Sequence, residues 1–136
     1  DQDWMYTVMT KGTDGKVSTR VCASMIDYIW AGQGVSNQQR LIEQLVAPET
    51  KIVSLTVTEK GYTADLTSDE LDFSLPENNW MLNHTAGKLK ALEAVTKGIS
   101  PFKSPLSFLT AACELRRQRG LPGLTIMSCD NLQGNG

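Results

Sequence analysis

The chain has 136 residues, 40% of them apolar, and a formal net charge of -2 from 13 basic and 15 acidic side chains. This length fits one domain with a real core and excludes a multidomain assembly. The near balance of charge argues against a dedicated nucleic-acid-binding protein and against a charge-rich disordered chain. No apolar run approaches the roughly 20 residues that cross a bilayer, so neither a membrane span nor a signal peptide is expected.

The hairpin signal comes first along the chain. Two runs rich in β-forming residues, Tyr6–Thr10 and Lys16–Ala23, flank an Asp14-Gly15 step. An Asp-Gly step between two such runs predicts a β-hairpin, because both residues tolerate the backbone that a tight turn requires.

A helix is predicted next. Ser36 or Asn37 is expected to cap it, and it should run to about Val46, because Pro48 cannot continue it. Its apolar residues at helical spacing are Leu41, Ile42 and Leu45.

The best strand of the first half covers residues 51–58. Val53, Leu55 and Val57 alternate with serine and threonine, and Glu59–Tyr62 should end the strand. The following polar stretch is expected to be irregular, with a short helix near Leu89–Val95. The lone histidine, His84, is interpreted as a surface or hydrogen-bonded residue.

Ser104-Pro105 predicts the start of another helix, because serine caps helices well and proline is tolerated in the first turn. Leu106, Leu109 and Cys113 should form its buried face. The run Arg116–Arg119 is interpreted as a solvated helix end, closed by Gly120 and Pro122. The residues that follow, Leu124–Cys129, predict a short buried strand.

This alternation of strands and helices predicts an α/β fold with a parallel sheet and helices against its faces. Ligands of such sheets lie outside the carboxyl ends of the strands. Two strand ends with short polar residues can be placed there, Thr56–Glu59 and Ser128–Asn131. The competing interpretation is that these residues cap the helices that follow.

Other kinds of site have little support. The cysteines Cys22, Cys113 and Cys129 are odd in number and widely spaced, which predicts no metal site and no disulfide framework. Buried free thiols in a reducing cytoplasm are expected instead. No Ser/His/Asp or Cys/His arrangement is evident. Gly32-Gln33-Gly34 lacks the third glycine of a dinucleotide loop.

Two long segments resemble the mannitol dehydrogenase family of long-chain, metal-independent polyol dehydrogenases, which includes fructuronate and tagaturonate reductases. They are Lys51–Tyr62 and Thr125–Asn131, the second continuing to Asn135-Gly136. Leu115–Pro122 and Tyr6–Val8 are also similar. The resemblance runs in order along nearly the whole chain.

The resemblance implies that residues 1–136 form a single, partial Rossmann-type NAD(P)-binding domain. The family's phosphate loop would lie upstream, and its helical substrate domain with the catalytic lysine downstream, so the 136 residues alone should be inactive. The asparagine of the family's active site corresponds to Asn131, whose amide would donate to the substrate oxygen. The residues that would border NAD or NADP are Thr56, Val57, Thr58, Glu59 and Asp130.

The function implied is that of a cytoplasmic dehydrogenase. It would transfer hydride between a nicotinamide cofactor and a polyol or sugar acid, such as mannitol/fructose or mannonate/fructuronate, with no nucleic-acid or membrane partner. The segment between Asp72 and Pro105 looks longer than the family's usual connection, which leaves the identity of the substrate open. The cofactor preference and the oligomeric state are open as well. The alternative is a non-catalytic, stand-alone α/β binding module, which the flanking gene sequence would distinguish.

Overall fold

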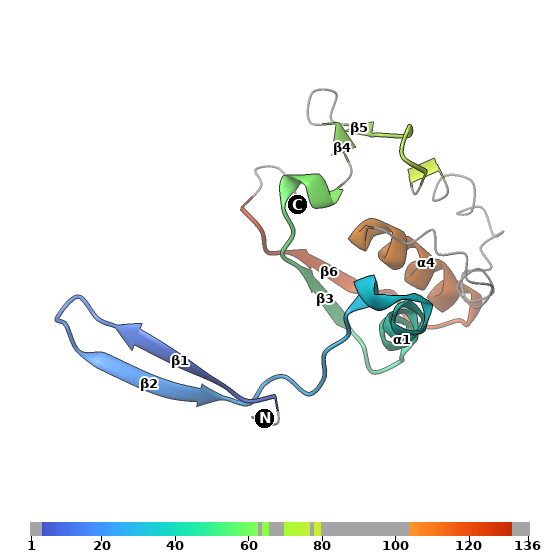
Figure 1. The fold of residues 1–136 in the computed structure, drawn as a ribbon. Helices are drawn as coiled ribbons and strands as arrows, with labels where there is room; N and C mark the ends of the chain where they lie inside the picture. The colour runs from blue at the N-terminus through green and yellow to red at the C-terminus, as the bar shows by residue number, and fades with distance from the viewer. Residues whose placement is uncertain (1–3, 63, 66–69, 77, 80–103, 132–136) are drawn as a thin grey trace. The chain divides into compact units, whose positions relative to one another are not determined.

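The computed structural model describes residues 4–62, 64–65, 70–76, 78–79 and 104–131. The chain divides into two compact units, Asp1–Trp30 and Ala31–Gly136. The first contains an antiparallel hairpin, and the second contains a parallel strand pair with helices (Figure 1). The predicted α/β class, with a parallel sheet, flanking helices and a hairpin near the N-terminus, is therefore confirmed. In the part of the chain described, no helix combines the length and apolarity needed to span a membrane.

The hairpin of the first unit pairs β1, Tyr6–Lys11, with β2, Val17–Cys22. The register runs from Tyr6 opposite Cys22 to Lys11 opposite Val17. Gly15 in the connecting turn has a φ of 77°, a backbone conformation that glycine adopts at little cost. The Asp-Gly prediction is thus confirmed.

The first helix of the second unit, α1, spans Val35–Val46 and follows a short 3-10 turn at Ala31–Gln33. Its N-cap is Gly34, with a φ of 109° and no side-chain cap. The prediction that Ser36 or Asn37 caps the helix is therefore wrong. Between the 3-10 turn and the helix the backbone takes a positive φ at Gly34. Glycine adopts this conformation at little cost, so the helix begins directly after it.

The parallel pair joins β3, Ile52–Leu55, to β6, Thr125–Ser128. Their register places Ile52 beside Thr125 and Leu55 beside Ser128. β3 is shorter than the predicted strand, because Thr56–Thr58 leave the ladder and a 3-10 turn, η2, follows at Glu59–Tyr62. Beyond it, β4, Ala64–Asp65, pairs antiparallel with β5, Glu70–Leu71.

The second long helix, α4, spans Pro105–Gln118. The side chain of Ser104 accepts from the Ser107 backbone N–H at 3.3 Å, and the Ser107 hydroxyl accepts from the Ser104 N–H at 3.3 Å. This reciprocal cap satisfies two amide groups that the first turn would leave unpaired. Gly120, with a φ of 65°, follows the helix end. Both predicted boundaries of this helix are confirmed.

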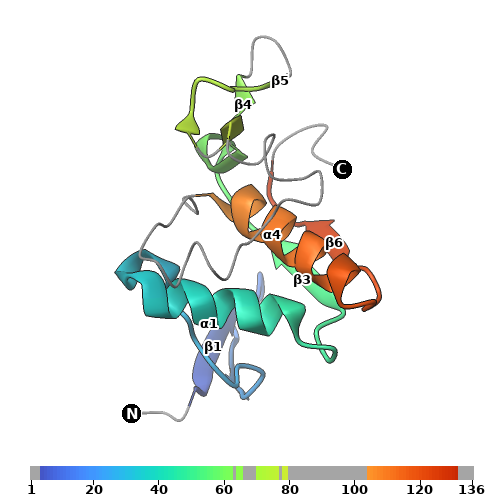
Figure 2. The same cartoon turned by 90° about the vertical axis from the view of Figure 1, so that its right-hand side faces the viewer.

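The core lies between α1, α4 and one face of the strand pair (Figure 2). Val53 and Leu55 of β3 pack against it. Each large apolar side chain buried here contributes about 2 kcal/mol through removal from water. The core residues are Ile42, Leu45, Val46, Phe108, Leu109, Ala111, Ala112 and Leu115.

The apolar face predicted for the second helix was wrong in part. Leu109 is buried, but Leu106 is only half-buried and Cys113 is exposed. The buried stripe is centred on Phe108, Ala112 and the residues around them, because α1 packs against that side of α4.

The prediction of a buried final strand is also wrong. Ile126 and Met127 of β6 are 47% and 46% exposed, and Ile52 of β3 is 60% exposed. Within the described residues β6 pairs with β3 alone, and the helices pack on one face of that pair. Ile52 and Met127 lie on the opposite face, in contact with solvent, whereas Ile126 lies beside Val53 on the helix side, at an open pocket.

Two expectations lie outside the described residues: the helix near Leu89–Val95 and the surface position of His84. The greater part of the segment between Asp72 and Pro105 lies outside them as well.

Candidate functional site

The carboxyl ends of β3 and β6 meet at the same edge of the sheet. Leu55 and Ser128 are register partners, and the Cys129 N–H donates to the Leu55 carbonyl oxygen at 2.8 Å. The chain therefore leaves both strands at one level. This arrangement brings together the two segments that sequence reasoning proposed, Thr56–Glu59 and Ser128–Asn131.

The candidate residues at this edge differ in exposure. Thr56 and Thr58 are exposed, whereas Val57 is half-buried. On the other strand end, Asp130 is half-buried and Asn131 is exposed. Glu59 begins the turn η2. The Thr56 and Thr58 hydroxyl groups, the Asp130 carboxylate and the Asn131 amide thus belong to the two segments that leave the sheet at this edge.

The turn after β3 is tightly packed. The Gly61 N–H donates to the Thr58 carbonyl oxygen at 2.7 Å. A Cβ atom at Gly61 would lie 3.1 Å from the Cβ of Val57, so a larger residue would crowd this contact. The close approach turns the chain back and places Tyr62 beside β6.

Tyr62 is the site residue that sequence reasoning missed. Its hydroxyl lies 2.8 Å from the Ser128 Oγ and also donates to Oδ2 of Asp130. The Ser128 hydroxyl is 3.2 Å from the same Asp130 oxygen. Three oxygen atoms from two distant segments therefore form one hydrogen-bonded cluster, the Tyr62–Ser128–Asp130 cluster. The available signal was the position of Tyr62 at the end of the family-like segment Lys51–Tyr62.

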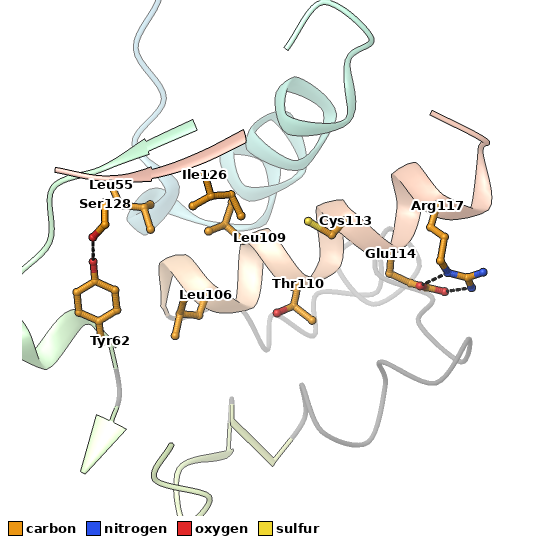
Figure 3. Close-up of a pocket in the computed structure, with 10 residues that line it drawn as sticks. All are labelled: Leu55, Tyr62, Leu106, Leu109, Thr110, Cys113, Glu114, Arg117, Ile126 and Ser128. Carbon is orange, nitrogen blue, oxygen red and sulfur yellow. Dashed lines mark hydrogen bonds and ion pairs between the residues drawn. The ribbon is translucent and has the colours of Figure 1, made fainter. Parts of the chain in front are cut away.

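Tyr62 and Ser128 of this cluster line the polar end of a pocket of about 620 Å³ between α4 and the strand pair (Figure 3). Figure 3 shows Tyr62 and Ser128 at one end and the Glu114–Arg117 pair at the other. Between them the lining is mostly apolar. It comprises Leu55, Leu106, Leu109, Thr110, Cys113 and Ile126. Leu106, Leu109 and Cys113, predicted to be the buried face of the helix, thus line this pocket.

The charged end of the pocket is an ion pair with good geometry. The Arg117 guanidinium donates to the two Glu114 carboxylate oxygens at 2.8 and 2.7 Å, and Gln118 donates at 2.9 Å. The bonds from Arg117 and then from Gln118 lower the pKa of Glu114 from 4.5 to about 2. The hydrogen bond to Glu114, and then the negative charge of Glu114, raise the pKa of Arg117.

The lowered Glu114 pKa predicts an acid-sensitive contribution to stability. Because the folded pKa lies below the unfolded one, the stabilisation is fully present above about pH 4.5 and is lost as the pH falls towards 2. The thermal midpoint of the wild type should therefore exceed that of Arg117→Gln above about pH 4.5, and this difference should shrink as the pH falls towards 2. Thermal denaturation of the complete protein from pH 6 downwards measures it. Arg119→Gln, on the exposed Arg119, is the matched control; a pH-independent difference for Arg117→Gln would contradict the prediction.

The neighbouring Arg116 does not belong to a solvated helix end, contrary to the sequence interpretation. It is 1% exposed. Its Nε donates to the Pro122 carbonyl oxygen at 2.8 Å, and its Nη1 donates to those of Leu45 and Ala47 at 3.1 and 2.9 Å. The guanidinium thus supplies partners for carbonyl groups at the end of α1 and beyond α4. Arg117 and Arg119 are exposed, as predicted.

The cysteines also differ from expectation. Cys113 and Cys129 are exposed, and Cys22 is half-buried, so none of these free thiols is a buried core residue. Within the described residues, His, Cys, Asp and Glu side chains form no group of three or more that could hold a metal ion.

Comparison with known proteins identifies relatives of the whole chain. The model of the mannitol dehydrogenase Rossmann domain matches residues 1–136. D-mannonate oxidoreductase of Escherichia coli K12 is 36% identical over 135 residues, which cover 99% of this chain and 24% of that protein. Mannitol 2-dehydrogenase of Phaeosphaeria nodorum is 35% identical over 135 residues, covering 99% of this chain and 21% of that protein.

Two solved structures share the fold. Mannitol 2-dehydrogenase of Pseudomonas fluorescens, in a ternary complex with NAD and D-mannitol, matches with a TM-score of 0.74 and 36% identity over 99% of this chain. A substrate-free D-sorbitol dehydrogenase matches with a TM-score of 0.76 and 27% identity over 98% of this chain. The chain spans 21% to 24% of the length of these four relatives. Because the family model covers every residue, the chain belongs to the mannitol dehydrogenase family, in the region of its Rossmann domain.

Proposed function

We propose that the complete protein is an NAD(P)-dependent dehydrogenase that transfers hydride between a nicotinamide cofactor and a secondary alcohol or ketone of a polyol or sugar acid. The match of the family's Rossmann domain to the entire chain is the observation on which this proposal rests. The relatives named above act on mannitol and mannonate, according to their names, so mannitol/fructose and mannonate/fructuronate are the proposed substrate pairs. Residues 1–136 would form one partial cofactor-binding domain.

The residues at the sheet edge fit a dinucleotide. Dinucleotides bind across the carboxyl ends of parallel strands, and β3 and β6 end there in register. Thr56 and Thr58 present exposed side chains with hydroxyl groups suited to ribose and amide groups. In this proposal Thr56, Val57, Thr58 and Glu59 border the cofactor from β3, and Asp130 does so from β6. When bound, the nicotinamide supplies or accepts the hydride.

Asn131 is the proposed catalytic residue. Its exposed side-chain amide is an N–H donor that can bind the substrate oxygen. Negative charge grows on that oxygen when a carbonyl is reduced, and a donor held in place stabilises it without reorganisation. The same donor binds the alkoxide form of the substrate when the alcohol is oxidised. The chain's own contribution is therefore to orient the reactants and to stabilise the developing charge.

The cytoplasm is the proposed location, and small molecules are the proposed partners. The free thiols of Cys113 and Cys129 lie exposed, which favours a reducing compartment because exposed thiols are readily oxidised elsewhere.

The test is a cofactor oxidation assay with the complete protein. We expect NADH or NADPH to be oxidised in the presence of fructose or fructuronate, and NAD or NADP to be reduced with mannitol or mannonate. Comparing the neutral and the anionic substrate pair distinguishes the two substrate classes. Cofactor binding without turnover on any of the four substrates would contradict the proposal and indicate a binding module.

A further inference from the structure

The Tyr62–Ser128–Asp130 cluster joins the turn after β3 to the strand end that bears Asn131. We infer that Tyr62 is a positioning residue, which holds Asp130, and through it Asn131, in the geometry that hydride transfer requires. This inference rests on the function proposed above for Asn131. Tyr62 itself need not touch the substrate or the cofactor in this role.

The geometry gives Tyr62 a firm base. Tyr62 ends the turn η2, whose Gly61 N–H is bonded to the Thr58 carbonyl oxygen at 2.7 Å. The same glycine packs so closely on Val57 that an added Cβ would meet it at 3.1 Å. Tyr62 is half-buried at the end of the pocket, with its hydroxyl directed at Ser128 (Figure 3). A phenol ring has two side-chain torsions, so packing at its base determines where the hydroxyl lies.

The hydroxyl connects two segments that are far apart in the sequence. Ser128 is the last residue of β6 and is fixed by its register with Leu55. Asp130 lies two residues beyond Ser128, the end of β6. Its Oδ2 receives an O–H bond from Tyr62 and has the Ser128 hydroxyl at 3.2 Å. O–H donors to an ionised carboxylate form the stronger class of hydrogen bond, so this cluster restrains the Asp130 side chain.

Restraint of Asp130 extends to the next residue. Asp130 and Asn131 share a planar peptide unit, so an anchored Asp130 leaves few torsions between the sheet and the Asn131 amide. Misplacement of a reacting group by about 1 Å can cost about 100-fold in rate. Loss of the Tyr62 donor leaves the Ser128 hydroxyl beside the Asp130 carboxylate, so the segment should loosen without being released, and a smaller effect is expected.

The test uses Tyr62→Phe in the complete protein, because phenylalanine keeps the ring and removes the hydroxyl. We expect kcat to fall about 10-fold while KM for the polyol changes less than about 3-fold, since the lost contact orients the transition state and binds no substrate. Tyr6→Phe, in β1 and 41% exposed, is the matched control and should change kcat by less than about twofold.

A second readout is independent of turnover. In the protein without cofactor, amide hydrogen exchange of the segment around Asp130 and Asn131 should be about 10-fold faster in Tyr62→Phe than in the wild type or Tyr6→Phe. Ser128→Ala and the double variant with Tyr62→Phe complete a cycle. Because both hydroxyl groups act on the same carboxylate, their effects on kcat should be non-additive.

The outcomes separate this inference from the function on which it rests. A wild-type protein without turnover overturns the proposed function, and exchange rates then decide whether Tyr62 anchors Asp130. An active wild type whose kcat is unchanged by Tyr62→Phe overturns the positioning role, even if the variant melts at a lower temperature. Unchanged exchange in the segment around Asp130 overturns it as well.

Discussion

Asn131→Ala in the complete protein is expected to lower kcat by about 100-fold or more. Removal of one donor that binds a developing oxyanion typically costs about 3 kcal/mol of transition-state stabilisation. Asn131 is exposed and lies after the last strand residue, Ser128, so its side chain contributes little to the core. Steady-state kinetics with the preferred ketose or keto acid, together with thermal denaturation of the same variant, separate turnover from folding.

Two further variants sharpen this test. Asn131→Asp keeps the size of the side chain but replaces the amide donor with a carboxylate, which repels the developing negative charge, so its kcat should be no higher than that of the alanine variant. Asn37→Ala, within α1, is the matched control and should leave kcat within about twofold of the wild type. If Asn131→Ala turns over like the wild type, the residue acts only as a cap for the chain that follows.

Arg116→Met should destabilise the protein by about 3 kcal/mol. The side chain is 1% exposed and donates to three carbonyl oxygens, those of Leu45, Ala47 and Pro122. Methionine retains a long apolar side chain but leaves these carbonyl groups without their charged donor in a buried place. Unpaired buried polar groups cost about 1–3 kcal/mol each, partly recovered by relaxation and water.

Thermal or urea denaturation of the complete protein measures this loss. Arg119→Met is the matched control, because Arg119 follows the same helix but is exposed. Its free energy of unfolding should differ from that of the wild type by no more than about 0.5 kcal/mol. The loss of stability for Arg116→Lys should lie between those of the two methionine variants, since one ammonium group cannot reproduce the planar fork of a guanidinium. Equal shifts for Arg116→Met and Arg119→Met would show that the buried bonds add nothing to stability.

Local signals predicted most of the secondary structure. The Asp14-Gly15 step predicted the hairpin, and Ser104-Pro105 predicted the start of α4, because turn and cap preferences depend on a few neighbouring residues. The alternation of Val53 and Leu55 predicted the inward face of β3. The cap of α1 was missed, because the 3-10 turn before it determines the backbone at Gly34.

Burial was predicted less well. Periodicity could not show that Arg116 is enclosed while Arg117 and Arg119 are exposed, because a charged run at a helix end looks the same in either environment. It also could not show that Ile126 and Met127 are 47% and 46% exposed. The burial of a strand depends on which elements cover its two faces, and those elements are remote in sequence.

At the candidate site, the family resemblance, the parallel strands and the polar residues at their carboxyl ends could all be predicted from the amino-acid sequence. Those features follow from local composition and from the rule that ligands of parallel sheets bind at that edge. The contact of the Tyr62 hydroxyl with Ser128 and Asp130, which lie 66 and 68 residues away, became visible in the folded chain alone. A hydrogen bond across that separation forms only when the register of β3 with β6 and the close Gly61–Val57 turn bring both segments to one place.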